Sequence, residues 1–218
     1  MRSTPLVLAA FALISLLSSC SVLPEPEPDD GLTKYQRQHK AFQEQESTRG
    51  LIYKNEELVP LLSPESSRIE ISVSDQRARI YAGEEVAIDT PVSTGKKSHP
   101  TPTGDFTIIE KKKDKRSNLY GNIYNSGGKW VANGDRRKKK VPSGGKFVGA
   151  SMPYWMRLTR TGIGLHVGRV PNYPASHGCI RLPSKIAPVI FTNTKLGTPV
   201  SIKSRWPEPA PTPVAGDA

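Results

Sequence analysis

Short stretches of alternating apolar and polar residues, broken by glycine and proline, are the feature that most constrains the fold of this chain. Residues 68–73 alternate in this way, which is the pattern of a strand with one buried face. Residues 78–81 and 86–92 predict a β-hairpin through residues 82–85. Further strands are predicted at residues 106–109, 147–148, 155–158, 164–167 and 199–202. With 18 Gly and 20 Pro in 218 residues, the chain is expected to be a mainly β sandwich or barrel with one or two short helices.

Two segments carry helix signals. Residues 184–195 predict a helix with Ser184 as its N-cap and Gly197 just beyond its end. Pro188 would fall in the first turn, where few backbone hydrogen bonds are lost. Residues 32–48 are polar with scattered apolar side chains and predict a second short helix.

Composition divides the chain into four parts. Residues 1–19 are predicted to be a signal peptide, and residues 20–66 a tether followed by a polar segment. Residues 21–30 contain alternating proline and acid, which favours an extended spacer. One folded domain is predicted at residues 67–204, and the Pro-rich tail at residues 205–218 is predicted to be disordered.

The first twenty residues indicate export. Arg2 precedes an uncharged, mostly apolar run at residues 5–17, and small residues follow it. Leu-Ser-Ser-Cys at residues 17–20 resembles a bacterial lipobox, in which Cys20 would be lipidated and would anchor the chain to a membrane. The alternative is an ordinary signal peptide with an incidental cysteine. Ser21 replaces the Asp of an inner-membrane retention signal, which favours the outer membrane, with the protein facing the periplasm.

The charge balance points to anionic partners. The chain carries a net charge of +11 and its pI is about 9.7. After export, anionic lipid and peptidoglycan are expected partners and nucleic acid is not. Two basic runs, at residues 111–116 and 136–140, are either solvated loops or surfaces that adhere to an anionic wall or membrane.

Cysteine usage singles out one thiol. The chain has 2 cysteines, so acylation of Cys20 would leave Cys179 without a disulfide partner, and a lone exported thiol is expected to be buried or used. A thiol has a pKa of about 8.5 and needs a base or positive dipole to attack as thiolate. His166 and His177 are the candidate bases, and the amides of Gly178 and Cys179 are candidate oxyanion donors.

These residues fall in a familiar pattern. His166 lies thirteen positions before Cys179, and residues 176–181 read Ser-His-Gly-Cys-Ile-Arg. This pattern resembles the active-site signature of the YkuD-type L,D-transpeptidases, although the spacing is short for that family. Residues 91–96, 101–106 and 152–156 also resemble the family, so the resemblance covers about residues 69–203.

The resemblance implies a YkuD-like catalytic domain at residues 67–204 and assigns roles within it. His166 would be the base, oriented by the main-chain carbonyl of Val167, while His177 would shape the site. Ser176, Tyr154 and Arg181 would bind substrate, with a structural salt bridge as the alternative role of Arg181. The absence of Asp and Glu from residues 144–203 agrees with a carbonyl as the orienting group.

The expected function is a peptidoglycan L,D-transpeptidase that cross-links stem peptides through a Cys179 thioester, with no metal or organic cofactor. Alternatives are an L,D-carboxypeptidase, attachment of an envelope protein to peptidoglycan, and a non-catalytic wall-binding lipoprotein. The residues themselves leave two further interpretations open. One is a zinc site of His166, His177 and Cys179, and the other is a buried cysteine with two packing histidines.

Overall fold

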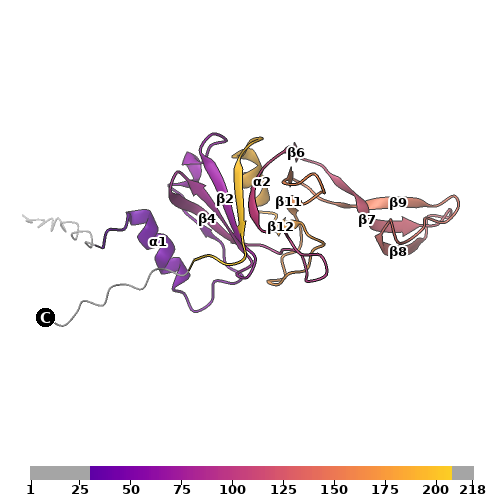
Figure 1. Ribbon diagram of the computed structural model, residues 1–218, viewed down its shortest axis with the longest axis horizontal. Coiled ribbons are helices and arrows are strands. Elements are labelled where there is room, and N and C mark those ends of the chain that lie inside the picture. Colours follow the sequence, from indigo (N-terminus) through magenta and orange to yellow (C-terminus); the bar gives the residue numbers. More distant parts are fainter. Residues whose placement is uncertain (1–29, 208–218) are drawn as a thin grey trace, which may run out of the picture. The chain divides into compact units, whose positions relative to one another are not determined.

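The computed structural model describes residues 30–207 (Figure 1). Of these, residues 32–207 belong to one compact unit. The predicted signal peptide, Cys20 and most of the Pro-rich tail lie outside the described residues. Within the described part of the chain, no helix is long and apolar enough to cross a membrane.

The first sheet has six strands in the order β1-β4-β3-β2-β13-β5. Their bounds are β1 Tyr53–Lys54, β4 Glu85–Pro91, β3 Arg77–Ala82, β2 Ser67–Ser72, β13 Pro199–Lys203 and β5 Gly104–Thr107. All neighbours are antiparallel except β13 and β2, which run parallel. The predicted hairpin is confirmed as β3 and β4.

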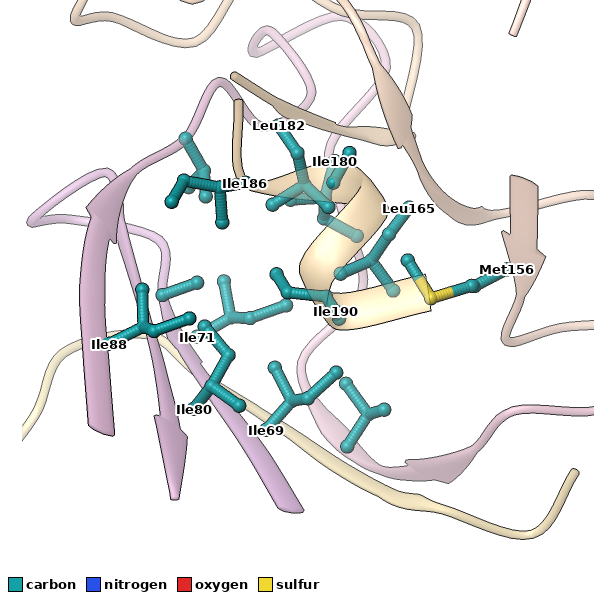
Figure 2. Packing of buried hydrophobic residues seen from close by; sticks show 14 of the residues in the cluster. Ile69, Ile71, Ile80, Ile88, Met156, Leu165, Ile180, Leu182, Ile186 and Ile190 are labelled. Atoms are coloured by element: carbon teal, nitrogen blue, oxygen red, sulfur yellow. The ribbon is translucent and has the colours of Figure 1, made fainter. Parts of the chain in front are cut away.

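The second sheet has four strands in the order β12-β11-β10-β6. They are β12 Ile180–Leu182, β11 Gly164–Val167, β10 Trp155–Arg157 and β6 Glu110–Lys112. The pair β11 and β12 is parallel and the others are antiparallel. The core joins both sheets with helix α2 (Ala187–Thr192), as Figure 2 shows for side chains such as Ile71, Leu165 and Ile190. The predicted mainly β fold is therefore confirmed.

A third sheet extends away from the other two and is called the flap here (Figure 1). Its strands are β7 Arg116–Tyr124, β8 Trp130–Asp135 and β9 Lys146–Ser151, paired antiparallel in the order β8-β7-β9. Most flap side chains are exposed or half-buried, and Ile123 is a buried exception. From the sequence, only residues 147–148 of the flap are predicted to be strand.

The N-terminal part of the compact unit contains helix α1 (Lys34–Gln43) and the short helix η1 (Val59–Leu61). A capping box of Thr33 and Gln36 starts α1, as Thr33 accepts a hydrogen bond from the Gln36 amide and its own amide bonds the Gln36 side chain. His39 and Phe42 are the buried side chains of this helix. Residues 32–66 thus pack with the domain that was predicted to begin at residue 67.

Helix α2 is shorter than predicted. It begins after Ile186 rather than Ser184, and no side chain caps it. The amides of Ile186 and Ala187 both donate to the Pro183 carbonyl, so residues 183–186 form a turn instead of the first helical residues. Pro188 does lie in the first turn, as expected.

Candidate active site

The parallel pairing of β11 and β12 gathers the principal predicted site residues on one face. Leu165 pairs with Ile180, and His166 pairs with Arg181. Leu165 and Ile180 are fully buried in the core. Because side chains alternate along strands, His166 and Arg181 point to the opposite face, and so does Cys179 just before β12. All three line a cavity of about 730 Å³.

The loop that carries Cys179 is held by hydrogen bonds. The Ser176 hydroxyl accepts from the Gly178 amide at 3.0 Å and donates to the Cys179 carbonyl. Thr101 Oγ1 donates to the Gly178 carbonyl at 2.7 Å and accepts from the Gly95 amide at 2.8 Å. The hydroxyl of Ser176, predicted to bind substrate, therefore serves the loop itself.

Gly178 is required by its backbone geometry. Its φ is +111°, and a Cβ there would lie 2.6 Å from Ile163 Cδ1. A side chain at this position would be strained in its backbone conformation, and the Ile163 side chain would have to shift to make room for it. The glycine thus permits the turn that presents Cys179 to the cavity.

The expected two-amide oxyanion hole is only partly present. The Gly178 amide is already committed to Ser176 Oγ, so it does not point freely at a substrate. Among residues 30–207, no group accepts a hydrogen bond from the Cys179 amide, so it remains available to a ligand. The sequence could not show that a neighbouring hydroxyl would occupy one of the two donors.

The thiol of Cys179 is shielded and protonated at neutral pH. Its Sγ lies 3.6 Å from the Gly162 carbonyl, to which it donates. Burial raises the pKa of Cys179, while the Gly164 backbone and the charges of Arg181 and Arg157 oppose that rise. The thiol therefore needs a base to become nucleophilic.

The imidazole of His166, which lines the same cavity, is held in a defined tautomer. Its Nδ1 lies 2.7 Å from the Val167 carbonyl, the contact implied by the family resemblance. A carbonyl can only accept, so Nδ1 donates and Nε2 keeps its lone pair in the neutral ring. Burial lowers the pKa of His166 to about 4, with the Val167 carbonyl opposing this effect. The imidazole is therefore a neutral proton acceptor at pH 7.

His177 has different surroundings. Its ring lies between Tyr120 of the flap, at 4.5 Å between centroids, and His99, at 4.9 Å. Burial, followed by the nearby charges of Lys96 and His99, lowers the pKa of His177. The ring contacts make His177 part of the cavity wall between the flap and the loop of residues 95–101.

The cavity is strongly basic. Among residues 30–207, no Asp or Glu lines it, whereas six cationic side chains do: Lys115, Arg137, Arg157, Arg160, Arg169 and Arg181. Arg157 pairs with Glu110 and Arg137 with Asp135. Arg181 has no ion-pair partner within residues 30–207, which favours a substrate carboxylate over a structural salt bridge as its role. Its stem passes Gly168, where a Cβ would come within 2.8 Å of Arg181 Cγ.

Tyr154, predicted to bind substrate, is not brought to the cavity. Its ring packs edge-on against Phe191 of α2, with centroids 5.5 Å apart. Conversely, Tyr120, Arg137 and His99 line the cavity but were not predicted. The only signal for His99 was its position between the two upstream segments that resemble the family.

The described residues contain no group of three His, Cys, Asp or Glu side chains arranged to hold a metal ion. His166, His177 and Cys179 all line one cavity, and the His177 ring also contacts the rings of His99 and Tyr120. The zinc interpretation of these three residues therefore has no support in their geometry.

Comparison with known proteins gives a match over most of the folded region. The family described as the L,D-transpeptidase catalytic domain, YkuD, matches residues 66–202. No curated protein gives a significant match. Similar solved structures include an L,D-transpeptidase from Mycobacterium smegmatis, with 19% identity and a TM-score of 0.48 over 63% of this chain and 58% of that chain.

Two further solved structures are similar. L,D-transpeptidase 3 from Mycobacterium tuberculosis, in complex with a faropenem-derived adduct, has 23% identity and a TM-score of 0.45, over 63% of this chain and 60% of that chain. A mutant of the Enterococcus faecium L,D-transpeptidase has 26% identity and a TM-score of 0.46, over 63% of this chain and 50% of that chain. The chain thus spans less than two thirds of the length of each of these three proteins.

Proposed function

This chain belongs to the YkuD family of L,D-transpeptidase catalytic domains, and from that membership we propose that it cross-links peptidoglycan stem peptides through a thioester on Cys179. The observation that carries the proposal is the neutral His166, held by the Val167 carbonyl on the same sheet face as a protonated Cys179. A cavity lined by cations and by no acid suits a substrate that carries several carboxylates.

The proposed first step is acylation. His166 Nε2 takes the proton from Cys179 Sγ as the sulfur attacks the carbonyl of the L-residue in a donor tetrapeptide. The oxygen of the tetrahedral intermediate gains negative charge and accepts from the Cys179 amide. The protonated imidazole then gives its proton to the departing amine of the terminal D-alanine, which leaves a thioester.

The second step regenerates the thiol. An amine of an acceptor stem attacks the thioester carbonyl and loses a proton to His166. The intermediate collapses, the C–S bond breaks, and the sulfur recovers a proton from the imidazolium. The Val167 carbonyl accepts from Nδ1 throughout, so the ring keeps its orientation while its charge changes.

A product analysis tests this proposal. The full chain is incubated with purified tetrapeptide muropeptides, and the products are weighed. Cross-linked dimers with released D-alanine support transpeptidation, whereas tripeptide monomers would show that water is the acceptor. The control is Cys179→Ser, which should lose turnover because an alcohol is far harder to deprotonate than a thiol. If the unchanged chain forms neither cross-linked dimers nor tripeptide monomers, the proposal is refuted.

We also propose that the protein is exported, lipidated at Cys20 and held at the outer membrane. The support is the order of apolar run, small residues and cysteine at residues 5–20, with Ser21 following. Cys20→Ala should lose the acyl mass and leave the membrane fraction, whereas Cys179→Ala should stay membrane-bound. Equal membrane retention and acyl mass in Cys20→Ala would contradict the anchor. Separation of inner and outer membranes on a density gradient tests which membrane holds the protein.

Attachment of an envelope protein to the wall is an outcome that labelled acceptor proteins would reveal.

A further inference from the structure

The positive charge of the chain is concentrated in one region. Residues 111–151 contain 12 Lys or Arg and 2 acids, a net charge of +10 out of +11 for the whole chain. This region comprises the flap and the segment leading into it. The catalytic chemistry proposed above uses none of the flap's outer part, so its charge needs another explanation.

One face of the flap is defined by its strand register. Tyr124 lies opposite Trp130 on β8 and opposite Lys146 on β9. Residues directly opposite one another share a face of the sheet. Asn122 and Tyr120 share that face with Tyr124, because alternate residues of a strand point the same way. Asn133, Asp135 and Val148 lie opposite these residues on the same face. The full set is called the flap face: Tyr120, Asn122, Tyr124, Trp130, Asn133, Asp135, Lys146 and Val148.

The flap face is continuous with the catalytic cavity. Tyr120, at its inner end, lines the cavity and contacts the His177 ring at 4.5 Å. The Tyr120 hydroxyl accepts from Arg137, another cavity residue, at 3.4 Å. If a side branch of a polymer lies in the cavity, the main chain of that polymer would therefore contact this face just outside the cavity.

The indole of Trp130 lies along the sheet. Its Nε1 donates to Asn122 Oδ1, 3.4 Å away on the neighbouring strand, and Asn122 is diagonal to Trp130 in the register. Trp130 is nevertheless 55% exposed, so much of its surface remains available to a ligand. A ring tied down in this way offers a flat apolar surface with polar groups beside it, rather than a wedge projecting into lipid.

Cationic, aromatic and amide groups lie beside the indole. Lys146 Nζ lies 5.9 Å from the centroid of the Tyr124 ring, and Asn122 and Asn133 lie opposite each other on the same face. Flat aromatic surface with amide and hydroxyl groups suits a sugar ring, whose two faces are apolar and whose rim forms hydrogen bonds. The surrounding lysines would attract the carboxylates of neighbouring stem peptides.

We propose that the flap face binds the glycan strand of peptidoglycan, on which the stem peptide held in the catalytic cavity is carried. A pyranose ring stacks on Trp130, and the charge of residues 111–151 draws the anionic polymer to it. This inference rests on the proposed function and names the polymeric form of its substrate. It predicts that the enzyme binds glycan strands as well as the peptide.

The test measures binding of soluble glycan strands, freed of their stem peptides by an amidase, to purified protein by calorimetry. Trp130→Ala should weaken binding about three- to tenfold, Trp130→Phe should restore most of it, and Leu196→Ala should have no effect. Leu196 is a matched control because it is 60% exposed and lies between α2 and β13. Lys146→Ala, a substitution at an exposed position, provides a second variant that retains the fold and should also weaken binding.

Equal binding by the unchanged chain, Trp130→Ala and Lys146→Ala would overturn the inference. The inference would also be overturned if these variants lost binding to phosphatidylglycerol vesicles but kept binding to glycan strands. The flap face would then be a membrane-binding surface. Turnover of soluble tetrapeptides by the unchanged chain decides the proposed function separately. An active enzyme with no binding of glycan strands would therefore refute this inference alone.

Discussion

Two buried ionisable centres, one in each of the larger sheets, have opposite surroundings. Asp89 in β4 is 1% exposed, and His166 in β11 is 8% exposed. Asp89 contacts three cationic or basic groups: His39 Nε2 at 2.8 Å, Arg77 Nε at 2.6 Å and Arg79 Nε at 3.2 Å. His166 has the Val167 carbonyl as its hydrogen-bond partner among the described residues.

The two pKa values show what this difference does. Burial by itself would raise the pKa of Asp89, but His39 and the two arginines hold it below its ordinary value. Burial lowers the pKa of His166 to about 4, and burial raises the pKa of the Cys179 thiol. A buried group with partners of opposite charge stays ionised and can join structural elements. A buried group without such partners becomes neutral and is ready to exchange a proton.

The Asp89 cluster has a structural task. Arg77 also donates to the carbonyls of Thr48, at 2.6 Å, and Leu51, at 3.1 Å. His39 brings α1 to the same carboxylate. The cluster therefore connects residues 32–51 to the six-stranded sheet through hydrogen bonds and ion pairs. None of its side chains lines the cavity that contains Cys179 in the described part of the chain.

The largest expected effect tests the reactive centre. His166→Ala should slow acylation of Cys179 by about 10²–10⁴-fold, because the proton acceptor is lost. The rate of Cys179 alkylation is measured against pH in this variant, with His177→Ala as its counterpart. His166→Ala should remove the reactivity near neutral pH, while His177→Ala should chiefly disturb substrate positioning. The opposite result would make His177 the base.

The next effect tests the structural centre. Asp89→Ala should lower the free energy of unfolding by about 3–5 kcal/mol, because buried cationic groups would lose their carboxylate. Urea unfolding measures the change. Glu65→Ala removes an exposed partner of Lys195 and should change little, as exposed pairs contribute weakly. An Asp89→Ala variant as stable as the unchanged chain would show that the cluster is not structural.

The smallest effect separates the two centres by pH. Between pH 6.5 and about 4, His166 is protonated in the unfolded chain but neutral in the folded chain. The free energy of unfolding therefore falls as the pH falls through this range. His166 should account for about 3 kcal/mol of this loss. Asp89 has a lowered pKa, so its contribution is complete above about pH 4 and is lost only at lower pH.

Urea unfolding of the unchanged chain and of His166→Asn, at several pH values from 7 to 4, measures this window. The variant should lose less stability than the unchanged chain over that range. Parallel pH curves for the two proteins would contradict the uncompensated burial of His166. His177 also has a lowered pKa and contributes in the same direction in both proteins.

The sequence predicts the strands that have one buried face and misses those without one. Residues 68–73 alternate because Ile69 and Ile71 face the core, and the strand was predicted within one residue at either end. Strands β7 and β8 lie in the flap, where most side chains on both faces contact water. No burial pattern marks such strands, so the sequence predicts neither of them.

The same physical reason divides the site residues. His166 and Arg181 lie on two adjacent strands, Cys179 directly precedes the second of them, and their chemistry shows in a local motif. Tyr120 and His99 reach the cavity from distant segments, through contacts that only the tertiary fold creates. The role of the Ser176 hydroxyl was likewise hidden, because the donor it occupies belongs to the Gly178 backbone.

The single hydroxyl of Thr101 joins two segments far apart in the chain. It bonds the Gly95 amide and the Gly178 carbonyl, and Thr101 and Gly178 are 77 residues apart in sequence. Closing a long loop costs conformational entropy, so a contact of such separation depends on the surrounding fold rather than on local structure. The cysteine turn is therefore held in part by the segment between β4 and β5. An unfolded chain would carry an ordinary thiol, and the proposed acyl-transfer chemistry would require the complete fold.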